Sequence, residues 1–275
     1  MAVNYEEIRK RAKDIRIDVI KSIYQAGSGH PGGSLSAADM MAVLFFHELN
    51  LDPHNPKMIH RDKFVLSKGH AAPVLYATLA ERGFFPKEEL MSLRKFGSNL
   101  QGHPDMRKVP GVEMSTGSLG QGISAAVGMA LAAKLDNNPG RVYVMLGDGE
   151  IQEGMVWEAM MAAAHYNLDN LIVLLDWNGI QIDGWNDEVM CITPVEEKMK
   201  SFCWETIVID GHDVKDIVKA LEKARNCKGK PCAIIAKTKK GKGVSFMEDN
   251  NGWHGKAPNE EQAKQAVAEL GGDWS

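Results

Sequence analysis

Short apolar runs separated by longer, periodically apolar stretches predict an α/β protein. Five runs have the length and apolar content of buried strands, at residues 63–66, 142–146, 171–175, 206–209 and 231–236. Helices are predicted around them at residues 5–26, 37–48, 71–82, 85–96, 121–135 and 213–227, around 155–163, and within 190–202 and 257–275. Because strands alternate with helices, we expect one mostly parallel sheet with helices on both faces.

Glycines and prolines mark the predicted breaks between these elements. Residues 27–33 read GSGHPGG and are predicted to form a loop that carries His30. Ser36 is predicted to cap the following helix by accepting a hydrogen bond from a free backbone N–H. Residues 111–122 form a second glycine-rich loop, which opens the helix at 121–135. This loop lacks the GxGxxG spacing, so a dinucleotide site is not expected.

Polar clusters follow two strands that are one helix apart. GDG at 147–149 follows the run at 142–146, and DWNG at 176–179 follows the run at 171–175. Ligands of open α/β sheets bind at the carboxyl ends of the strands. The Asp148 carboxylate and the Asn178 amide oxygen suit Mg²⁺ or Ca²⁺, and Mg²⁺ usually shares its shell with phosphate. We therefore predict a metal-bridged diphosphate, with simple turn formation as the alternative.

Composition and charge narrow the class of protein. The chain has 275 residues, 44% of them hydrophobic, which suits one large domain spanning 1–275. A net charge of −4 gives no broad attraction to nucleic acid or to anionic membranes. No apolar run reaches the roughly 20 residues that cross a bilayer, and the charged amino terminus is unlike a signal peptide. The cysteines form no CxxC pair, so reduced thiols in a cytoplasmic protein are expected.

The segment 147–184, GDGEIQEGMVWEAMMAAAHYNLDNLIVLLDWNGIQIDG, resembles the thiamine diphosphate motif of the transketolase family. The usual motif ends in two Asn residues, of which Trp177 replaces the first and Asn178 keeps the second. The resemblance implies bound thiamine diphosphate with Mg²⁺, the metal being held by Asp148, Asn178 and the Ile180 carbonyl. It implies further cofactor contacts by Gly147, Gly149 and Ile182.

Four histidines lie in glycine-flanked loops that are similar to other transketolase segments. They stand in SGHPGGSLS, SKGHAAPVLYA, QGHP and NGWHG, at His30, His70, His103 and His254. The resemblance implies that His70 and His254 reach the diphosphate and that His103 reaches substrate hydroxyls. Neutral imidazoles can exchange protons with a hydroxyl near pH 7. We assign all four to the catalytic cavity, against the alternative of surface-loop histidines.

Three further segments carry assignments that depend on the resemblance. TGSLGQG at 116–122 is similar to the transketolase loop at the aminopyrimidine pocket, which implies cofactor contacts by Gly117, Ser118 and Leu119. Glu153 and Glu158 resemble glutamates that link two active sites at the subunit contact, and a solvated helix face is the alternative. The basic loop at 239–242 either helps to hold a phosphate or is simply solvated.

The resemblance covers nearly the whole chain but only about the first half of an ordinary transketolase. It implies the amino-terminal subunit of a split enzyme of the pentose phosphate pathway, acting on sugar phosphates. The partner would be a separate pyrimidine-domain subunit, in a heterotetramer with two copies of each chain. Three alternatives stay open: a split enzyme for a sulfo- or branched ketose, another thiamine enzyme such as a deoxyxylulose-phosphate synthase or 2-oxoacid dehydrogenase, and a non-catalytic binding module.

Overall fold

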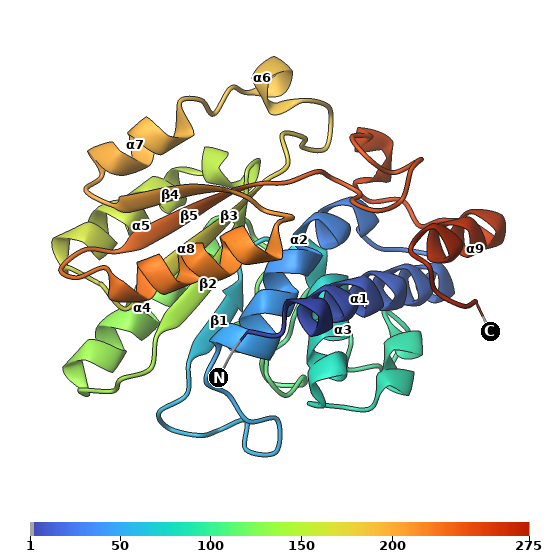
Figure 1. Ribbon diagram of the computed structural model, residues 1–275, viewed down its shortest axis with the longest axis horizontal. Coiled ribbons are helices and arrows are strands. Elements are labelled where there is room, and N and C mark those ends of the chain that lie inside the picture. Colours follow the sequence, from blue (N-terminus) through green and yellow to red (C-terminus); the bar gives the residue numbers. More distant parts are fainter. Residues whose placement is uncertain (1–2, 275) are drawn as a thin grey trace.

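A single parallel sheet forms the centre of the molecule in the computed structural model, which describes residues 3–274 (Figure 1). Its strands are β1 (Lys63–Leu66), β2 (Val142–Gly147), β3 (Leu171–Trp177), β4 (Glu205–Asp210) and β5 (Cys232–Lys237). All neighbours pair in parallel, in the order β1-β2-β3-β5-β4. The predicted strands and the predicted parallel α/β architecture are therefore confirmed.

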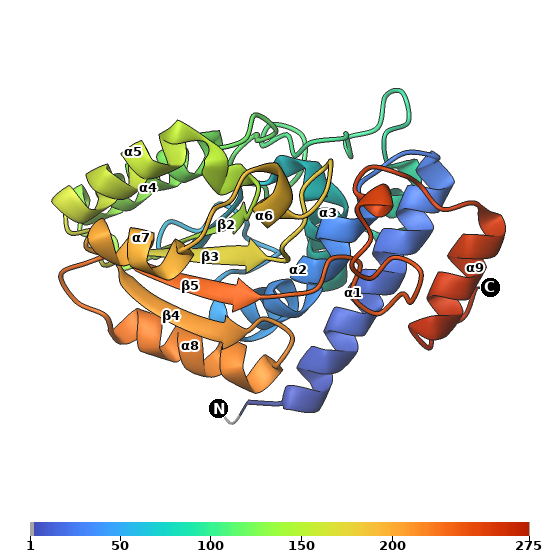
Figure 2. The ribbon, with the colours of Figure 1, turned by 90° about the horizontal axis from the view of Figure 1, so that it is seen from above.

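Helices cover both faces of this sheet. On one face, α1 (Tyr5–Ala26), α2 (Pro31–Val43), α3 (Ala72–Arg82) and α8 (Val214–Asn226) share an apolar core with the sheet, and α9 (Glu260–Glu269) packs on α1 at its outer side. The other face packs on α4 (Gln121–Leu135), α5 (Gly154–His165) and α7 (Val195–Ser201). Figure 2 shows α4 and α5 on one side of the strands and α8 on the other. Short helical turns complete the chain: η1 (Leu44–Glu48), η2 (Gly69–Ala71), η3 (Lys87–Ser92), η4 (Glu150–Gln152), α6 (Asn186–Val189) and η5 (Asn251–Trp253).

The strands divide their side chains between two apolar cores because successive residues of a strand point to opposite faces. In β2, Tyr143 and Met145 join the core under α1 and α2. Val144 and Leu146 join the core under α4 and α5. A strand that is buried on both faces is apolar at every position, which explains why β2 and β3 read as continuous apolar runs.

Helix α2 differs from the prediction at its start. Its first residue is Pro31, so Gly32 and Gly33 lie inside the helix and not in the predicted loop. Ser36 therefore lies within α2 and does not cap it. Its hydroxyl lies 3.2 Å from the Gly33 carbonyl oxygen and 2.5 Å from Asp176 Oδ2, and can donate to either. Proline is favoured in the first turn of a helix, where its missing N–H costs nothing.

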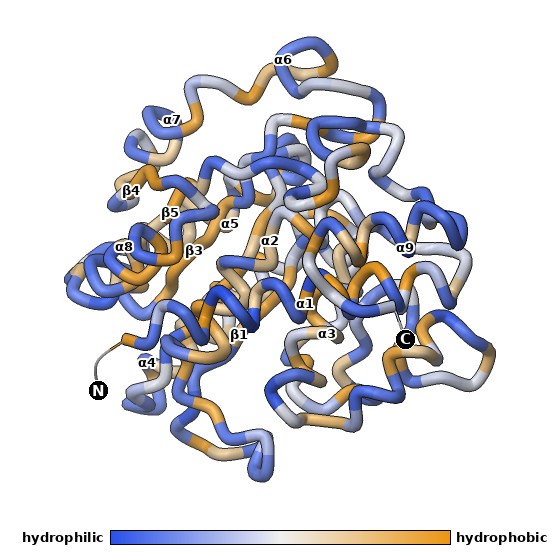
Figure 3. The backbone as a smooth tube through the Cα atoms, turned by 45° about the vertical axis from the view of Figure 1, so that its right-hand side comes forward, coloured by the Kyte–Doolittle hydropathy of each residue, from blue (hydrophilic) through white to orange (hydrophobic). Residues whose placement is uncertain are grey.

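The interior helix α2 is buried along its whole length, from Pro31 to Val43. Figure 3 shows the hydrophobic positions gathered in the interior around the strands and α2, with mostly hydrophilic positions along α9. Across residues 3–274, every helix is too short or too polar to cross a bilayer. The fold thus places the amino end of α2 beside the carboxyl edge of the sheet, where the polar clusters lie.

Candidate active site

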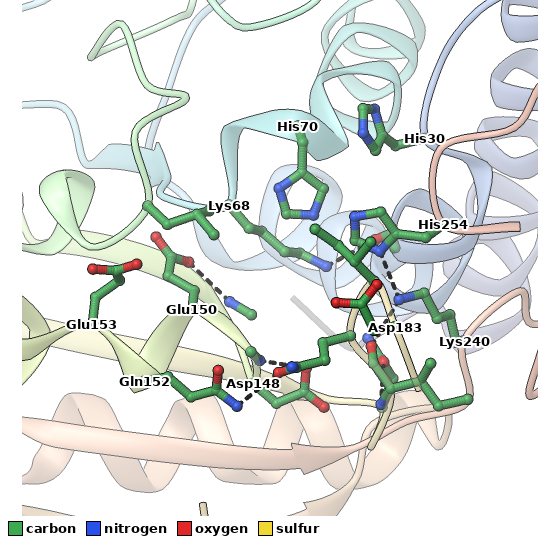
Figure 4. A pocket seen from close by; sticks show the side chains of 18 of the residues that line it. His30, Lys68, His70, Asp148, Glu150, Gln152, Glu153, Asp183, Lys240 and His254 are labelled. Atoms are coloured by element: carbon green, nitrogen blue, oxygen red, sulfur yellow. Dashed lines mark hydrogen bonds between the residues drawn. The ribbon is translucent and has the colours of Figure 1, made fainter. Parts of the chain in front are cut away.

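A cavity of about 330 Å³ opens where β2 and β3 end. Gly147 pairs with Asp176 across these strands, so the two polar clusters of the sequence meet as predicted. Figure 4 shows Asp148 of the first cluster and the side chains of several distant loops around this space. The lining residues on which the site depends are His30, Gly33, Lys68, His70, Gly117, Leu119, Gly147, Asp148, Gly149, Glu153, Asn178, Ile180, Ile182, Lys240 and His254.

Asp148 is one of the acidic residues that line the cavity, and it is almost wholly buried. Its two carboxylate oxygens accept hydrogen bonds from the backbone N–H groups of Gly149 at 2.8 Å and Gly179 at 2.5 Å. Burial, followed by the nearby Asp176 carboxylate, raises the pKa of Asp148 to about 6. The backbone therefore orients this carboxylate, and a bound cation would stabilise its charge.

The predicted metal ligands lie together. Asn178 Oδ1 accepts from the Ile180 backbone N–H at 3.2 Å, and Asp148 and Asn178 both line the cavity. The Ile180 carbonyl accepts from Lys240 Nζ at 2.7 Å. Within residues 3–274, no group of three or more His, Cys, Asp or Glu side chains is arranged to hold a metal. A site built from one carboxylate, one amide and one carbonyl would not form such a group, so its remaining ligands must come from phosphate or water.

Three of the four predicted histidines form a compact cluster. The ring centroids of His30, His70 and His254 lie 5.2 Å to 5.4 Å from one another. Figure 4 shows all three rings on one side of the cavity, across from Asp148. His30 comes from the residue before α2, His70 from η2 and His254 from the end of η5. Because these segments lie far apart along the chain, only the fold brings the three rings together.

The environment keeps these imidazoles uncharged near neutral pH. Burial, and then charge interactions with Arg94, His103 and Lys240, lower the pKa of His30 to about 4. Burial and the Lys240 ammonium lower the pKa of His254 to about 3. Burial and Lys68 also place the pKa of His70 well below its ordinary value. The buried Nδ1 atom of His30 has no hydrogen-bond partner within residues 3–274.

Of the remaining predicted site residues, some line the cavity and others do not. His103 packs against Gly117, where an added Cβ would lie 2.9 Å from the imidazole, and is not among the residues that line the cavity. Gly117 and Leu119 line it, whereas Ser118 between them is outside the lining. Glu153 lines the rim. Glu158 lies on α5, away from the lining residues.

Glu150, which the sequence pattern did not single out, organises the loops around the cavity. Its buried carboxylate accepts from Ser67 Oγ at 2.6 Å and from the backbone N–H groups of Gly120 and Gly147 at 3.0 Å. It therefore ties the GDG loop to the loops before η2 and α4. The GDGE sequence offers this acid, but the partners outside its own loop lie 30 and 83 residues away.

Two buried lysines, Lys68 and Lys240, add positive charge to the cavity. Lys68 Nζ donates to the Gly33 carbonyl at 2.8 Å and forms a buried ion pair with Asp176. Lys240 Nζ contacts the Ile180 carbonyl and lies 2.9 Å from His254 Nδ1 (Figure 4). Burial lowers the pKa of Lys240 to about 8. The basic loop at 239–242 thus places one of its lysines inside the cavity, contrary to a wholly solvated loop, and Lys68 had no assignment from the sequence.

Known proteins that match this chain include both transketolases and separate transketolase subunits. The family described as transketolase, thiamine diphosphate binding domain, matches residues 8–275. The 6-deoxy-6-sulfo-D-fructose transketolase subunit SqwG of Clostridium sp. (strain MSTE9) is 47% identical, over 96% of this chain and 96% of its own. One of the subunits of the apulose-4-phosphate transketolase of Phocaeicola vulgatus is 40% identical, over 96% of this chain and 94% of its own.

Longer relatives match over only part of their length. The transketolase of Mus musculus is 47% identical over 96% of this chain and 42% of its own length. A solved structure of transketolase from Leishmania mexicana superposes with a TM-score of 0.92 at 34% identity, covering 99% of this chain and 42% of that one. The chain therefore spans nearly all of the subunit-type relatives and less than half of these longer transketolases.

Proposed function

Because the chain belongs to the transketolase family, as its thiamine diphosphate-binding domain, we propose that it is the amino-terminal subunit of a split transketolase. With a carboxyl-terminal subunit it would move a two-carbon ketol unit from a ketose phosphate to an aldose phosphate. The observation that carries this proposal is the meeting of Asp148, Asn178 and the three-histidine cluster in one cavity. The coverage of subunit-type relatives supports the split form.

The residues present suit thiamine diphosphate and Mg²⁺. Asp148, Asn178 and the Ile180 carbonyl supply hard oxygen ligands, which Mg²⁺ prefers to nitrogen or sulfur. Two buried ammonium groups, of Lys68 and Lys240, face the same space and suit the negative charge of a diphosphate. Ca²⁺ would accept the same oxygen donors.

The chain's own groups would position the cofactor and exchange protons around it. When bound, thiamine diphosphate supplies the carbon nucleophile that carries the two-carbon unit. Neutral His30 would accept a hydrogen bond from a substrate hydroxyl, because its Nδ1 is unpaired within the described part of the chain and a pKa near 4 leaves the ring uncharged at neutral pH. His70 and His254 would contact the diphosphate, and His103 would approach substrate after a small rearrangement of its loop.

The mouth of the cavity would dock the carboxyl-terminal subunit. Ile182 lines the cavity yet is 64% exposed. Trp185 and Met190 follow on the same segment and are 45% and 61% exposed. Exposed apolar side chains beside a functional opening mark an interaction surface. A partner seated here would close the cavity, and an assembly of two copies of each chain, with Glu153 and Glu158 at the contact, agrees with the family resemblance.

A sulfo- or branched-sugar substrate is the second candidate. Relatives that match this chain over nearly their whole length are named for 6-deoxy-6-sulfo-D-fructose and apulose 4-phosphate. Both names denote a ketose, so the ketol transfer would be unchanged and the group that ends the sugar would differ. The pentose phosphate pathway and a cytoplasmic location are our assignments for an enzyme that acts on ordinary sugar phosphates.

The experiment that tests the function is a transfer assay with thiamine diphosphate and Mg²⁺. The chain is assayed by itself and co-purified with a carboxyl-terminal subunit encoded beside it, with ribose 5-phosphate as acceptor. Xylulose 5-phosphate, 6-deoxy-6-sulfo-D-fructose and apulose 4-phosphate are compared as donors. Turnover only by the pair supports the split enzyme, and the preferred donor selects the candidate. Turnover by the single chain, or none with any donor, would contradict the proposal.

The anchor assignment has its own test. Asp148→Ala in the assembled enzyme removes the carboxylate that we assign to the metal. We expect Mg²⁺-dependent retention of thiamine diphosphate through gel filtration to be abolished. Retention equal to that of the unaltered assembly would show that the metal binds elsewhere.

A further inference from the structure

His212 lies outside the cavity but is bonded to the loop that carries Lys240. It follows β4, in the turn before α8. Its Nδ1 atom lies 2.8 Å from Asp39 Oδ2 on α2. Its Nε2 atom lies 2.8 Å from the backbone N of Lys239. One imidazole thus joins α2 to the loop after β5, across 173 and 27 residues of sequence.

These two contacts define a single tautomer of His212. A backbone N–H can only donate, so Nε2 must be unprotonated to accept from Lys239. The ring proton then resides on Nδ1 and is donated to the Asp39 carboxylate. In the other neutral tautomer, Nε2–H would face the Lys239 N–H and Nδ1 would face the Asp39 oxygen, so both hydrogen bonds would be lost.

The Asp39 carboxylate is held in place by a second residue, Arg16. Arg16 donates to its two oxygens, at 3.2 Å from Nη1 and 2.5 Å from Nη2. Arg16 Nε also donates to the Leu35 carbonyl at 3.2 Å. Burial alone would raise the pKa of Asp39, but Arg16 and His212 lower it to about 2. The carboxylate is therefore charged at every physiological pH and accepts the Nδ1–H of His212.

The backbone on either side of Lys240 is held in place by these contacts. The Lys239 N–H is bonded to His212, and the Gly241 N–H donates to the Gly32 carbonyl of α2 at 3.0 Å. The Lys240 side chain extends between these points to the Ile180 carbonyl and His254. A buried lysine has many rotamers to lose on ordering, so a fixed backbone lowers the cost of directing its ammonium group.

We propose that His212 is a positioning residue, which with Asp39 and Arg16 fixes the Lys239–Lys240 backbone so that the Lys240 ammonium is directed into the diphosphate site. His212 does not line the cavity and would act only through this loop. The role of Lys240 toward the cofactor rests on the proposed function, whereas the clamp formed by Arg16, Asp39 and His212 is a property of the chain itself.

The clamp is tested first on the chain without its partner. Imidazole nitrogen shifts from ¹⁵N-histidine labelling should show the ring proton of His212 on Nδ1 and an unprotonated Nε2. Hydrogen exchange should show a protected Lys239 amide, which becomes unprotected in His212→Ala. An Nε2–H tautomer, or a rapidly exchanging Lys239 amide in the unaltered chain, would overturn the proposal.

The functional test compares two amides that each imitate one imidazole nitrogen. The oxygen of His212→Gln can reach the place of Nε2 and accept from Lys239, whereas His212→Asn reaches only the place of Nδ1. In the assembled enzyme we expect His212→Asn to raise the half-saturating concentration of thiamine diphosphate about tenfold, as loss of one hydrogen bond to an ordered loop would. We expect His212→Gln to stay within about twofold of the unaltered enzyme, and kcat at saturating cofactor to be retained by both.

His54→Asn provides the matched control, because it changes a histidine outside the cavity and the clamp. It should leave cofactor saturation unchanged. Equal effects of His212→Gln and His212→Asn, or none from either, would overturn the positioning role. An assembly that does not bind thiamine diphosphate would contradict the proposed function. The histidine tautomer and the exchange of the Lys239 amide would still show whether the clamp of Arg16, Asp39 and His212 exists.

Discussion

Two lysines line the same cavity and are equally buried, at 2% exposed each, yet their partners differ in kind. Lys68 is paired with the wholly buried carboxylate of Asp176. Lys240 donates to the Ile180 carbonyl and lies beside the neutral ring of His254, and within residues 3–274 it has no hydrogen-bonded carboxylate. Lys68 thus has a carboxylate in direct contact, whereas the Asp148 and Asp176 carboxylates act on Lys240 only through their charge. If the proposed function is right, Lys68 serves the structure first and Lys240 a bound anion.

The largest expected effect comes from breaking the compensated pair. Lys68→Met leaves the Asp176 carboxylate buried without its ammonium partner, which typically costs about 3–5 kcal/mol. Urea unfolding followed by circular dichroism should show that loss in the free energy of unfolding. The double variant Lys68→Met, Asp176→Asn removes both charges and should recover part of it. If the single variant lost less than about 1 kcal/mol in the free energy of unfolding, the buried Lys68–Asp176 pair would contribute no more to stability than an exposed ion pair does.

The second test removes the ammonium group that has no carboxylate in hydrogen-bond contact. Lys240→Met keeps the length of the side chain and should change the free energy of unfolding by less than about 1 kcal/mol. It should weaken binding of thiamine diphosphate by the assembled enzyme about 10- to 100-fold, the range for a hydrogen bond to a charged group. Isothermal titration gives the dissociation constant.

The matched control for this variant is Lys237→Met, which removes an exposed ammonium group three residues earlier, over the Trp177 ring. The dissociation constant of this variant for thiamine diphosphate should equal that of the unaltered enzyme. If both substitutions weakened binding equally, the net positive charge of the protein, and not the position of the Lys240 ammonium group, would determine the affinity.

The smallest expected effect concerns His70, whose pKa is lowered by burial and then by the Lys68 charge. The folded state holds His70 neutral while the unfolded state protonates it below about pH 6.5. The stability contributed by the neutral ring is therefore complete above that pH and is lost as the pH falls. His70→Asn should reduce the loss between pH 7 and pH 5 by up to about 2 kcal/mol.

Urea unfolding at the two pH values measures this difference, with His54→Asn as control. An unchanged pH dependence in His70→Asn would show that the ring is protonated in the folded state too.

The parallel sheet and the GDG and Asn178 clusters could be predicted because their signals are local. Buried parallel strands are apolar throughout, and chain order alone places their ends on one edge. The helix predicted at 121–135 has those bounds in the structure. The Asp176–Lys68 pair could not be predicted in this way, since it joins residues 108 apart. Nothing in the residues around Asp176 shows that its partner lies in another loop.

The error at α2 has a physical reason. Glycines usually interrupt helices, so the run through Gly32 and Gly33 predicts a loop. In the structure, a Cβ on Gly32 would lie 3.0 Å from both Lys240 Cγ and the Trp253 carbonyl. The close approach of the Lys240 loop therefore favours glycine here, and the surrounding contacts outweigh the low helix propensity. The sequence pattern cannot distinguish a glycine that ends a helix from a glycine inside a helix whose missing side chain lets another segment pack closely.

The enclosure of α2 also bears on engineering a new substrate range. Every residue from Pro31 to Val43 is surrounded by protein, so randomising this helix would mostly yield chains that do not fold. The segment that carries Ile182, Trp185 and Met190 is exposed beside the same cavity. Because we propose that this segment docks the partner subunit, a mutant library aimed at accepting a different sugar should leave both it and α2 untouched.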